Sequence, residues 1–311
     1  MLERIAGNEE LKSSIRRMLD GRRLTHSVLL VGEAGLGAGF AARCVAADYL
    51  YPQGGAPAEA LLRGECCRAV AKAGKRDSGQ IETGIVREAI SVTGMGSGGR
   101  YLVGQVTAMR TEIFNTSLSA EGRAVLLYHV ERMNEESANA LLKVMEEPPE
   151  GVLFLLTADS LAGVLPTIRS RCISFAVAPV SPEDCARYCT AQGVGAKDAA
   201  LYSALFDGHI GTVLAAARDE ARREQVDRAL ALAKAAAARD SYAAAALLAA
   251  YEKDKDGAGQ PQDRAVGAGG EVPDVLKKQK QPHCGCFCIV LIFDWLSACG
   301  SGSGSCRRRQ G

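Results

Sequence analysis

Short, continuous apolar runs alternate with segments of helical periodicity in the first part of the chain. Four of these runs are "SVLLV" (27–31), "RAVLLYHV" (123–130), "GVLFLLT" (151–157) and "ISFAV" (173–177). Runs of this length that are apolar throughout are typical of strands buried on both faces. Because helical patterns separate them, we expect an α/β fold in which a parallel sheet has helices on both faces.

Local signals mark where two of the helices begin and end. Asn8 is a predicted N-cap, since the apolar residues after it recur at helical spacing until Gly21. Asn134 is the predicted N-cap of a second helix, which Pro148 stops. Residues 52–100 are rich in Gly, Ala and charged residues, and they predict no particular organisation.

The pattern changes near residue 178, where helical segments follow one another without strands. We therefore divide the chain into an α/β domain over 1–177, a small helical domain over 178–218 and the start of a further helical domain over 219–252. Residues 253–311 interrupt the helical pattern with Gly, Pro and charged residues. We expect this last segment to be a disordered or aberrant tail.

Composition and charge exclude several classes of protein. With 37 Lys and Arg against 36 Asp and Glu, the formal net charge is +1, so no bulk basic field drives binding to DNA or membranes. No apolar run reaches the roughly 18 residues of a membrane span, and the charged N-terminal segment is not a secretory signal. The 11 cysteines show no disulfide framework, which indicates a reduced, cytoplasmic protein.

A glycine-rich loop, "VGEAGLGAGF" at 31–40, lies between the first predicted strand and a predicted helix. The spacing from Gly32 to Gly37 is that of the phosphate-binding loop G-x-x-x-x-G-K-[ST]. In that loop the lysine reaches the β- and γ-phosphates and the hydroxyl holds magnesium. Ala38 and Gly39 stand at those two positions here, so we expect the loop to be kept as architecture.

Three blocks of sequence carry a resemblance to a known family. They are the opening "IAGNEELKSSIRRMLDGRRLTHSVLLVG", the glycine loop, and "MNEESANALLKVMEEPPEGVLFLLTADSLAGVLPTIRSRC" at 133–172. In this order they resemble the clamp-loader subunits of the AAA+ class, and among these the delta-prime subunits of bacterial DNA polymerase III. The resemblance covers about residues 4–250. It implies an AAA+ α/β domain, a helical lid at 178–218 and a partial helical collar at 219–252.

The resemblance implies that the catalytic parts of an ATPase are missing. In active relatives the second strand ends in two acids, for magnesium and for the attacking water, and that pair corresponds here to Tyr128 and His129. Glu131 lies two residues beyond the metal-binding position. The nucleotide-sensing arginine of the lid corresponds to Gly211, whereas Thr157 keeps the family's polar sensor position. We therefore expect no bound cofactor and no intrinsic ATPase activity.

One charged residue of the family's machinery is present. "TIRSRC" places Arg171 where clamp-loader subunits present an arginine finger, which reaches the ATP of a neighbouring subunit. The alternative is an arginine that only interacts weakly with the dipole at the end of a short helix. The partners implied by the resemblance are the tau or gamma ATPase subunits, the delta subunit, the sliding clamp and primer-template DNA.

The resemblance therefore implies a non-hydrolysing delta-prime-like subunit that scaffolds the ATPase ring during DNA replication. A first alternative is an active tau/gamma-type ATPase, against which Ala38, Tyr128 and His129 argue. A second alternative is a folded relic whose changed C-terminal part prevents assembly.

Two adjacent cysteines, Cys66 and Cys67, lie where many relatives carry a four-cysteine zinc module. Zinc prefers four tetrahedral ligands, which are usually supplied as two separated pairs. The next cysteine along the chain is Cys172. We therefore interpret the pair as the remnant of an eroded module and expect no metal there.

Overall fold

The structure, a computed structural model, describes residues 1–21, 27–72, 77–115, 122–238, 242 and 246–248. The predicted tail at 253–311 and the end of the predicted collar segment therefore lie outside the described residues. By its internal contacts the chain divides into two units, Met1–Arg218 and Asp219–Gly311. The finer division of the first unit at residue 177 stays a prediction.

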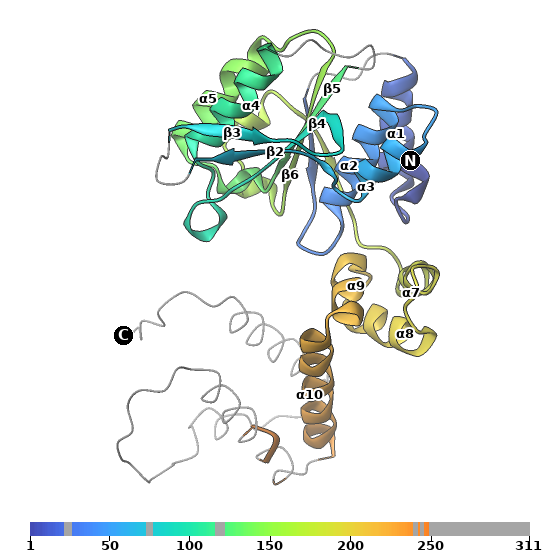
Figure 1. Cartoon of the computed structure of the whole chain (residues 1–311). Coiled ribbons are helices and arrows are strands. Elements are labelled where there is room, and N and C mark those ends of the chain that lie inside the picture. Colours follow the sequence, from blue (N-terminus) through green and yellow to red (C-terminus); the bar gives the residue numbers. More distant parts are fainter. Residues whose placement is uncertain (22–26, 73–76, 116–121, 239–241, 243–245, 249–311) are drawn as a thin grey trace, which may run out of the picture. The chain divides into compact units, whose positions relative to one another are not determined.

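A seven-stranded sheet forms the centre of the first unit (Figure 1), with the strand order β3-β2-β4-β5-β6-β1-β7. Every neighbouring pair is parallel except β2 and β3. The strands are β1 (Ser27–Val31), β2 (Cys66–Ala71), β3 (Gly79–Glu82), β4 (Val86–Thr93), β5 (Arg123–Tyr128), β6 (Val152–Ala158) and β7 (Ile173–Ala176).

The four strands predicted from apolar runs are all present. β5 ends two residues before the predicted limit of 130, because His129 adopts a left-handed conformation with φ of 58°. All seven residues of β6 are buried, as expected for a central strand covered on both faces. Residues 52–100, for which the sequence predicts no particular organisation, contribute β2, β3 and β4 to the sheet.

Helices cover both faces of the sheet. The helices of the first unit are α1 (Glu9–Asp20), α2 (Ala38–Leu50), α3 (Ala56–Leu62), α4 (Val103–Asn115), α5 (Glu135–Glu146), α6 (Pro166–Arg169), α7 (Pro182–Ala191), α8 (Ala196–Leu205) and α9 (Ile210–Arg218). Short 3-10 turns are η1 (Leu2–Arg4), η2 (Ser97–Gly99), η3 (Val130–Arg132) and η4 (Leu161–Gly163). Figure 1 shows α1, α2 and α3 on one side of the sheet and α4 and α5 on the other, which confirms the predicted α/β class.

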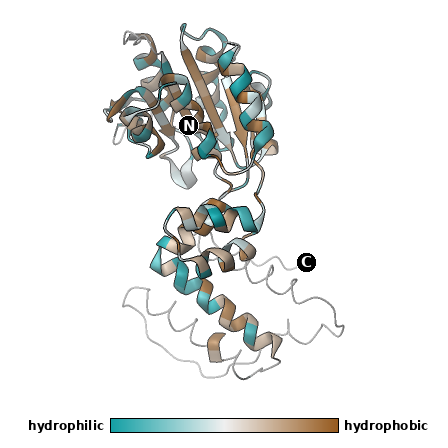
Figure 2. Cartoon of the chain, turned by 90° about the vertical axis from the view of Figure 1, so that its right-hand side faces the viewer, coloured by the Kyte–Doolittle hydropathy of each residue, from teal (hydrophilic) through white to brown (hydrophobic). Residues whose placement is uncertain are grey.

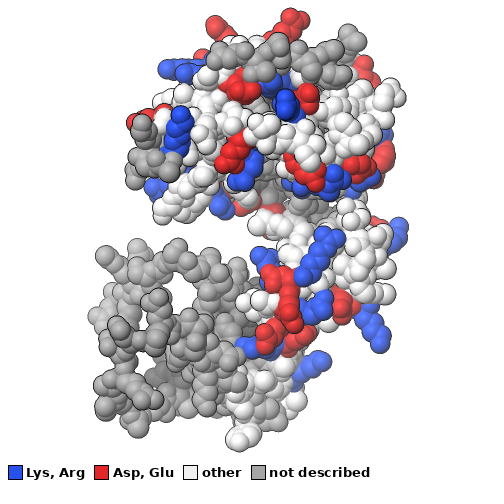
Figure 3. All heavy atoms as spheres, viewed as in Figure 1, with Lys and Arg blue, Asp and Glu red and all other residues white. Residues whose placement is uncertain are grey.

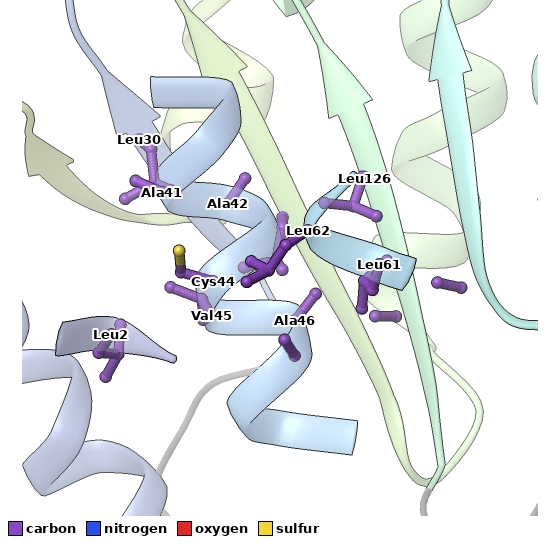
Figure 4. Packing of buried hydrophobic residues seen from close by; sticks show 14 of the residues in the cluster. Leu2, Leu30, Ala41, Ala42, Cys44, Val45, Ala46, Leu61, Leu62 and Leu126 are labelled. Atoms are coloured by element: carbon purple, nitrogen blue, oxygen red, sulfur yellow. The ribbon is translucent and has the colours of Figure 1, made fainter. Parts of the chain in front are cut away.

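Two hydrophobic clusters lie on the two faces of the sheet, one under α2 and α3 and the other under α4 and α5. The strands visible in Figure 2 are correspondingly hydrophobic. Figure 4 shows the first cluster, in which the small side chains of Ala41, Ala42 and Ala46 on α2 lie near Leu30 and Leu126. Small residues let the helix backbone approach the sheet closely, which a packed interior requires.

The two predicted N-caps have different outcomes. Asn134 caps α5 as predicted, because its side chain accepts a hydrogen bond from the backbone N–H of Ser137 at 2.9 Å. Asn8 precedes α1 but does not cap it. Asn8 has a left-handed φ of 53°, and its side chain instead exchanges hydrogen bonds with the backbone of Ala178. It thus ties the start of the chain to the segment that follows β7.

Three short helices, α7 to α9, follow the sheet without intervening strands. Buried residues of these helices include Cys185, Cys189 and Tyr202. The second unit contains α10 (Glu220–Ala237), whose N-cap Asp219 accepts a hydrogen bond from the N–H of Ala221 at 3.0 Å. α9 and α10 are thus separate helices, because Asp219 begins a new one.

Charges of both signs are interspersed on the molecular face that Figure 3 shows. This distribution agrees with the net charge of +1 and gives that face no extended field of one sign. Among the described residues, no helix combines the length and apolar character that a bilayer crossing needs.

Candidate functional site

The glycine loop connects the end of β1 to the start of α2 and is held by its own backbone. The N–H of Gly32 donates to the carbonyl of Ala158 at 3.0 Å. Gly35 and Gly37 have φ of 93° and 92°, a left-handed conformation that glycine adopts at little cost. Gly37 is also the N-cap residue of α2. The loop therefore keeps the strand-turn-helix geometry of a phosphate-binding loop.

The two positions that would carry lysine and hydroxyl lie against the protein interior. Ala38 is buried and belongs to the cluster under α2. Gly39 lies beside Tyr128, which ends β5: a Cβ added at Gly39 would be 3.3 Å from Cε1 of the tyrosine ring. Such a contact is tighter than ordinary van der Waals packing. The two positions that the resemblance assigns to a hydroxyl and an acid thus lie next to each other.

The Tyr128 phenol is neutral at pH 7, since the usual pKa of tyrosine is about 10. Removal from water raises its pKa above the usual value, and the nearby Arg43 guanidinium opposes this shift in part. The Nε of Arg43 donates to the carbonyl of Leu62 at 2.9 Å, so the cation beside the loop is already bonded within the protein. A neutral phenol at this position cannot replace a magnesium-binding carboxylate.

The start of α9 packs directly on the loop. The N–H of Gly211 donates to the carbonyl of Gly35 at 2.8 Å. A Cβ added at Gly35 would lie 2.0 Å from Oγ1 of Thr212, and one added at Gly211 would lie 2.9 Å from the Gly35 carbonyl oxygen. Gly211, which the resemblance assigns to the sensing arginine, therefore makes a close backbone contact with the loop. The residues gathered at this loop do not fit a magnesium-bound triphosphate.

Thr157 lies at the end of β6 and is buried. Its Oγ1 accepts a hydrogen bond from the N–H of His129 at 3.2 Å. The side chain at the family's sensor position thus links the carboxyl ends of two neighbouring strands and supports the left-handed turn at His129.

Arg171 follows α6 and presents a side chain that is 36% exposed. Its Nη1 donates to the carbonyl of Thr167 at 3.0 Å, and its Nη2 forms an ion pair with Glu146 at the end of α5. These two contacts fix the direction of a long side chain at the molecular surface.

Cys66 and Cys67 are adjacent on β2 but point to opposite faces of the sheet. Cys66 belongs to the cluster under α2 and α3, and Cys67 to the cluster under α4 and α5. Burial raises the pKa of the Cys66 thiol. A metal ion cannot bind two thiols that lie on opposite faces of one strand.

Asp159 was not singled out in the sequence, yet it lies one residue beyond β6 and close to His129 and Glu131. One possible ligand atom from each of these three side chains lies within 4.8 Å of the others. The sequence held a signal for this grouping, because carboxyl ends of adjacent parallel strands meet at one edge of a sheet. Recognising it required knowing that β5 and β6 are neighbours.

Comparison with known proteins identifies the family. Residues 7–181 match the family model described as "DNA polymerase III, delta subunit". The chain is 35% identical over 150 residues to the DNA polymerase III subunit delta' of Pseudomonas aeruginosa, covering 48% of this chain and 42% of that protein. It is 28% identical over 179 residues to the DNA polymerase III subunit gamma of Buchnera aphidicola, covering 58% of this chain and 45% of the relative.

Among solved structures, a gamma subunit-related protein from Thermotoga maritima aligns with 76% of this chain and 75% of its own, at 16% identity and a TM-score of 0.41. The chain spans less than half the length of the two curated relatives it matches. The family model nevertheless covers more than half of this chain, including the glycine loop and the strands around it. The chain belongs to the DNA polymerase III delta subunit family and is a clamp-loader family member.

Proposed function

We propose that this chain is a non-hydrolysing, delta-prime-like subunit of the DNA polymerase III clamp loader. The observation that carries the proposal is the approach of the Tyr128 ring to Gly39, where an added Cβ would lie 3.3 Å from the ring; it supports the proposal because the resemblance assigns magnesium binding to these two positions. Relatives named delta' and relatives named gamma both match the chain, so the choice between these roles rests on the site itself.

Hydrolysis requires groups that this site lacks. Phosphoryl transfer depends on positioning and on neutralisation of charge by lysine, magnesium and arginine. Ala38 replaces the lysine, and Gly39 and Tyr128 replace two magnesium-binding side chains. Gly211, in the lid position, makes a backbone contact with the loop instead of offering a guanidinium. These losses favour the delta-prime-like role over an active tau/gamma-type ATPase.

Arg171 is the residue through which the chain would act on a neighbour. A guanidinium binds phosphate oxygens with a planar fork of donors, and an arginine supplied by another subunit can stabilise the charge of phosphoryl transfer. The partly exposed position of Arg171, braced by Glu146, is compatible with this role. The ATP would belong to a tau or gamma subunit, and the delta subunit, sliding clamp and primer-template DNA would be further partners.

The proposal is tested first with the isolated full-length chain and with tau or gamma ATPase subunits from the same source. We expect no ATP hydrolysis by the isolated chain above a no-protein control, and we expect the chain to be retained by the immobilised ATPase subunits. Hydrolysis that is abolished by a change within residues 32–39 would instead support an active ATPase. A folded chain that the ATPase subunits fail to retain would support the relic alternative.

A further inference from the structure

We propose that His129, Glu131 and Asp159 form a binding site for a divalent transition-metal ion of the Zn²⁺ or Co²⁺ type. The proposal is independent of clamp loading, because it concerns the isolated chain. It also departs from the prediction that no metal is bound. That prediction rested on the cysteines and on the place of Glu131, two residues beyond the family's metal-binding position.

The three side chains come from the carboxyl ends of two neighbouring strands. His129 directly follows β5, Glu131 lies in η3, and Asp159 directly follows β6. β5 and β6 are parallel partners, so their carboxyl ends lie side by side. The left-handed backbone at His129 reverses the chain there, and Thr157 holds that turn through a hydrogen bond to the His129 N–H. The grouping is thus fixed by the sheet.

The two distances from His129 to the carboxylates match those between ligands of one tetrahedral ion, and all three ligand atoms lie within 4.8 Å of one another. Nδ1 of His129 lies 3.4 Å from Oε1 of Glu131 and 3.3 Å from Oδ1 of Asp159. Bonds of about 2.0–2.1 Å from zinc to nitrogen or oxygen place tetrahedral ligands about 3.3–3.4 Å apart. A single ion between His129 and the two carboxylates could therefore contact all three side chains.

Two buried atoms of the grouping make no hydrogen bond to the described residues, although one of them, Nδ1 of His129, lies near both carboxylates. Nδ1 of His129 and Oε2 of Glu131 are both buried, and neither has a hydrogen-bond partner within the described part of the chain. One proton on Nδ1 cannot point at two carboxylates at once, whereas a cation is attracted to both. Arg132 lies 3.7 Å from Glu131 and neutralises part of its charge. Asp159 has no ion pair other than that with His129 among the described residues.

The side chains also indicate the class of ion and leave room for a further ligand. Imidazole favours zinc and similar ions over magnesium and calcium, which prefer all-oxygen sites. The His129 and Asp159 side chains are 39% and 34% exposed, so the site opens to solvent. Three protein ligands with an open fourth position are typical of zinc sites that also bind water or another small ligand.

The test is equilibrium dialysis of the untagged full-length chain against Co²⁺, with bound Co²⁺ measured per chain. We expect the wild type to hold one more Co²⁺ than the variants His129→Asn and Asp159→Asn. Asparagine tolerates the left-handed backbone at position 129, and it matches the shape of the aspartate at 159. Any Co²⁺ bound by cysteines or histidines elsewhere in the chain contributes equally to all variants and cancels in the difference.

A matched control is His209→Asn. His209 also lies near a carboxylate, with its Nε2 3.6 Å from Oε2 of Glu33, but it belongs to no group of three ligands among the described residues. This variant should bind as much Co²⁺ as the wild type. Co²⁺ should also raise the melting temperature of the wild type more than that of Asp159→Asn, because binding to the folded state stabilises it. Equal Co²⁺ binding by the wild type and Asp159→Asn would overturn the proposal.

Discussion

At the scale of single residues, the two positions that the family resemblance assigns to magnesium binding lie next to each other. By the family resemblance, Tyr128 corresponds to a metal-binding acid and Gly39 to a metal-binding hydroxyl. The structure places these two positions side by side, so that a Cβ added at residue 39 would lie 3.3 Å from the Tyr128 ring, closer than ordinary packing. A larger side chain at residue 39 would therefore have to displace the Tyr128 ring.

The variant Gly39→Thr tests this coupling. We expect it to lower the free energy of unfolding by about 1–3 kcal/mol, the usual cost of adding atoms to a packed site. In a Tyr128→Ala background the added cost should be smaller by about 0.5–3 kcal/mol, since the ring that Thr would meet is gone. Urea unfolding of the four proteins gives both values.

The control for the Gly39→Thr variant is Gly195→Thr. Gly195 is the N-cap residue of α8, where threonine is a favoured residue and where an added Cβ meets only Asp198 Oδ2 at 3.9 Å. This change should leave stability unchanged or increase it. An equal cost of Gly39→Thr in both Tyr128 backgrounds would show that the ring does not occupy the site.

At the scale of elements, α9 and the glycine loop form a single packed unit. The backbone hydrogen bond between Gly211 and Gly35, together with the Thr212 side chain beside Gly35, leaves no space for a side chain at Gly35. Gly35→Ala should be more destabilising than Gly37→Ala by about 1–3 kcal/mol. Both positions share nearly the same left-handed φ, but a Cβ at Gly37 meets nothing within 4 Å. The difference in melting temperature between the two variants therefore measures the contact with α9.

A second change shows whether Thr212 causes that difference. Thr212→Ala removes the Oγ1 that would lie 2.0 Å from the new Cβ at position 35. In this background the costs of Gly35→Ala and Gly37→Ala should become similar. If Gly35→Ala and Gly37→Ala had the same melting temperature in the wild-type background, α9 would not be packed on the loop.

The elements that the sequence predicted are those with an undisturbed apolar pattern. β4 was missed because Glu88 interrupts its apolar run, and that carboxylate accepts a hydrogen bond from the Tyr51 hydroxyl at 2.8 Å. α4 was missed because Gln105 stands at a fully buried position, where its Nε2 donates to the carbonyls of Thr93 and Ala69. Both exceptions are polar residues whose partners are distant in sequence.

The candidate site was predictable only in part, for a similar reason. The frame of the loop and the positions of Ala38, Gly39 and Arg171 follow from sequence spacing and family resemblance. The contact of Tyr128 with Gly39, and the approach of Asp159 to His129, depend on which strands and helices are neighbours. Spacing along the chain carries no information on such contacts.

At the scale of the whole molecule, the predicted boundary at residue 252 can be tested without reference to function. Residues 253–311 are rich in glycine, proline and charge and show no periodic apolar face. Removing them should change the melting temperature of the remaining chain by no more than about 2 °C, since little apolar surface would be lost. Differential scanning calorimetry of the full and shortened chains measures this. A clear fall in the melting temperature would mean that this segment packs on the rest of the protein.

The role of Arg171 belongs to the scale of the assembly, although its effect on folding should be small. Its ion pair with Glu146 is partly exposed, and pairs of this kind contribute about 0–1 kcal/mol to stability. Arg171→Ala should therefore fold and should still bind the ATPase subunits. Compared with Arg171→Ala, the variant Arg171→Lys should recover little of the DNA-stimulated ATP hydrolysis by the complex, because lysine lacks the planar fork that binds two phosphate oxygens.

The most direct measurement is DNA-stimulated ATP hydrolysis by a clamp loader reconstituted with wild-type chain, Arg171→Ala or Arg169→Ala. Arg169 lies two residues away and is also exposed, so it controls for the loss of a surface charge. Arginine fingers in GTPase systems contribute about 10³–10⁵ in rate, but only one site of the ring would lose its finger. We therefore predict a partial loss of hydrolysis with Arg171→Ala and none with Arg169→Ala. Unchanged hydrolysis with Arg171→Ala, in a fully assembled complex, would contradict the proposed role.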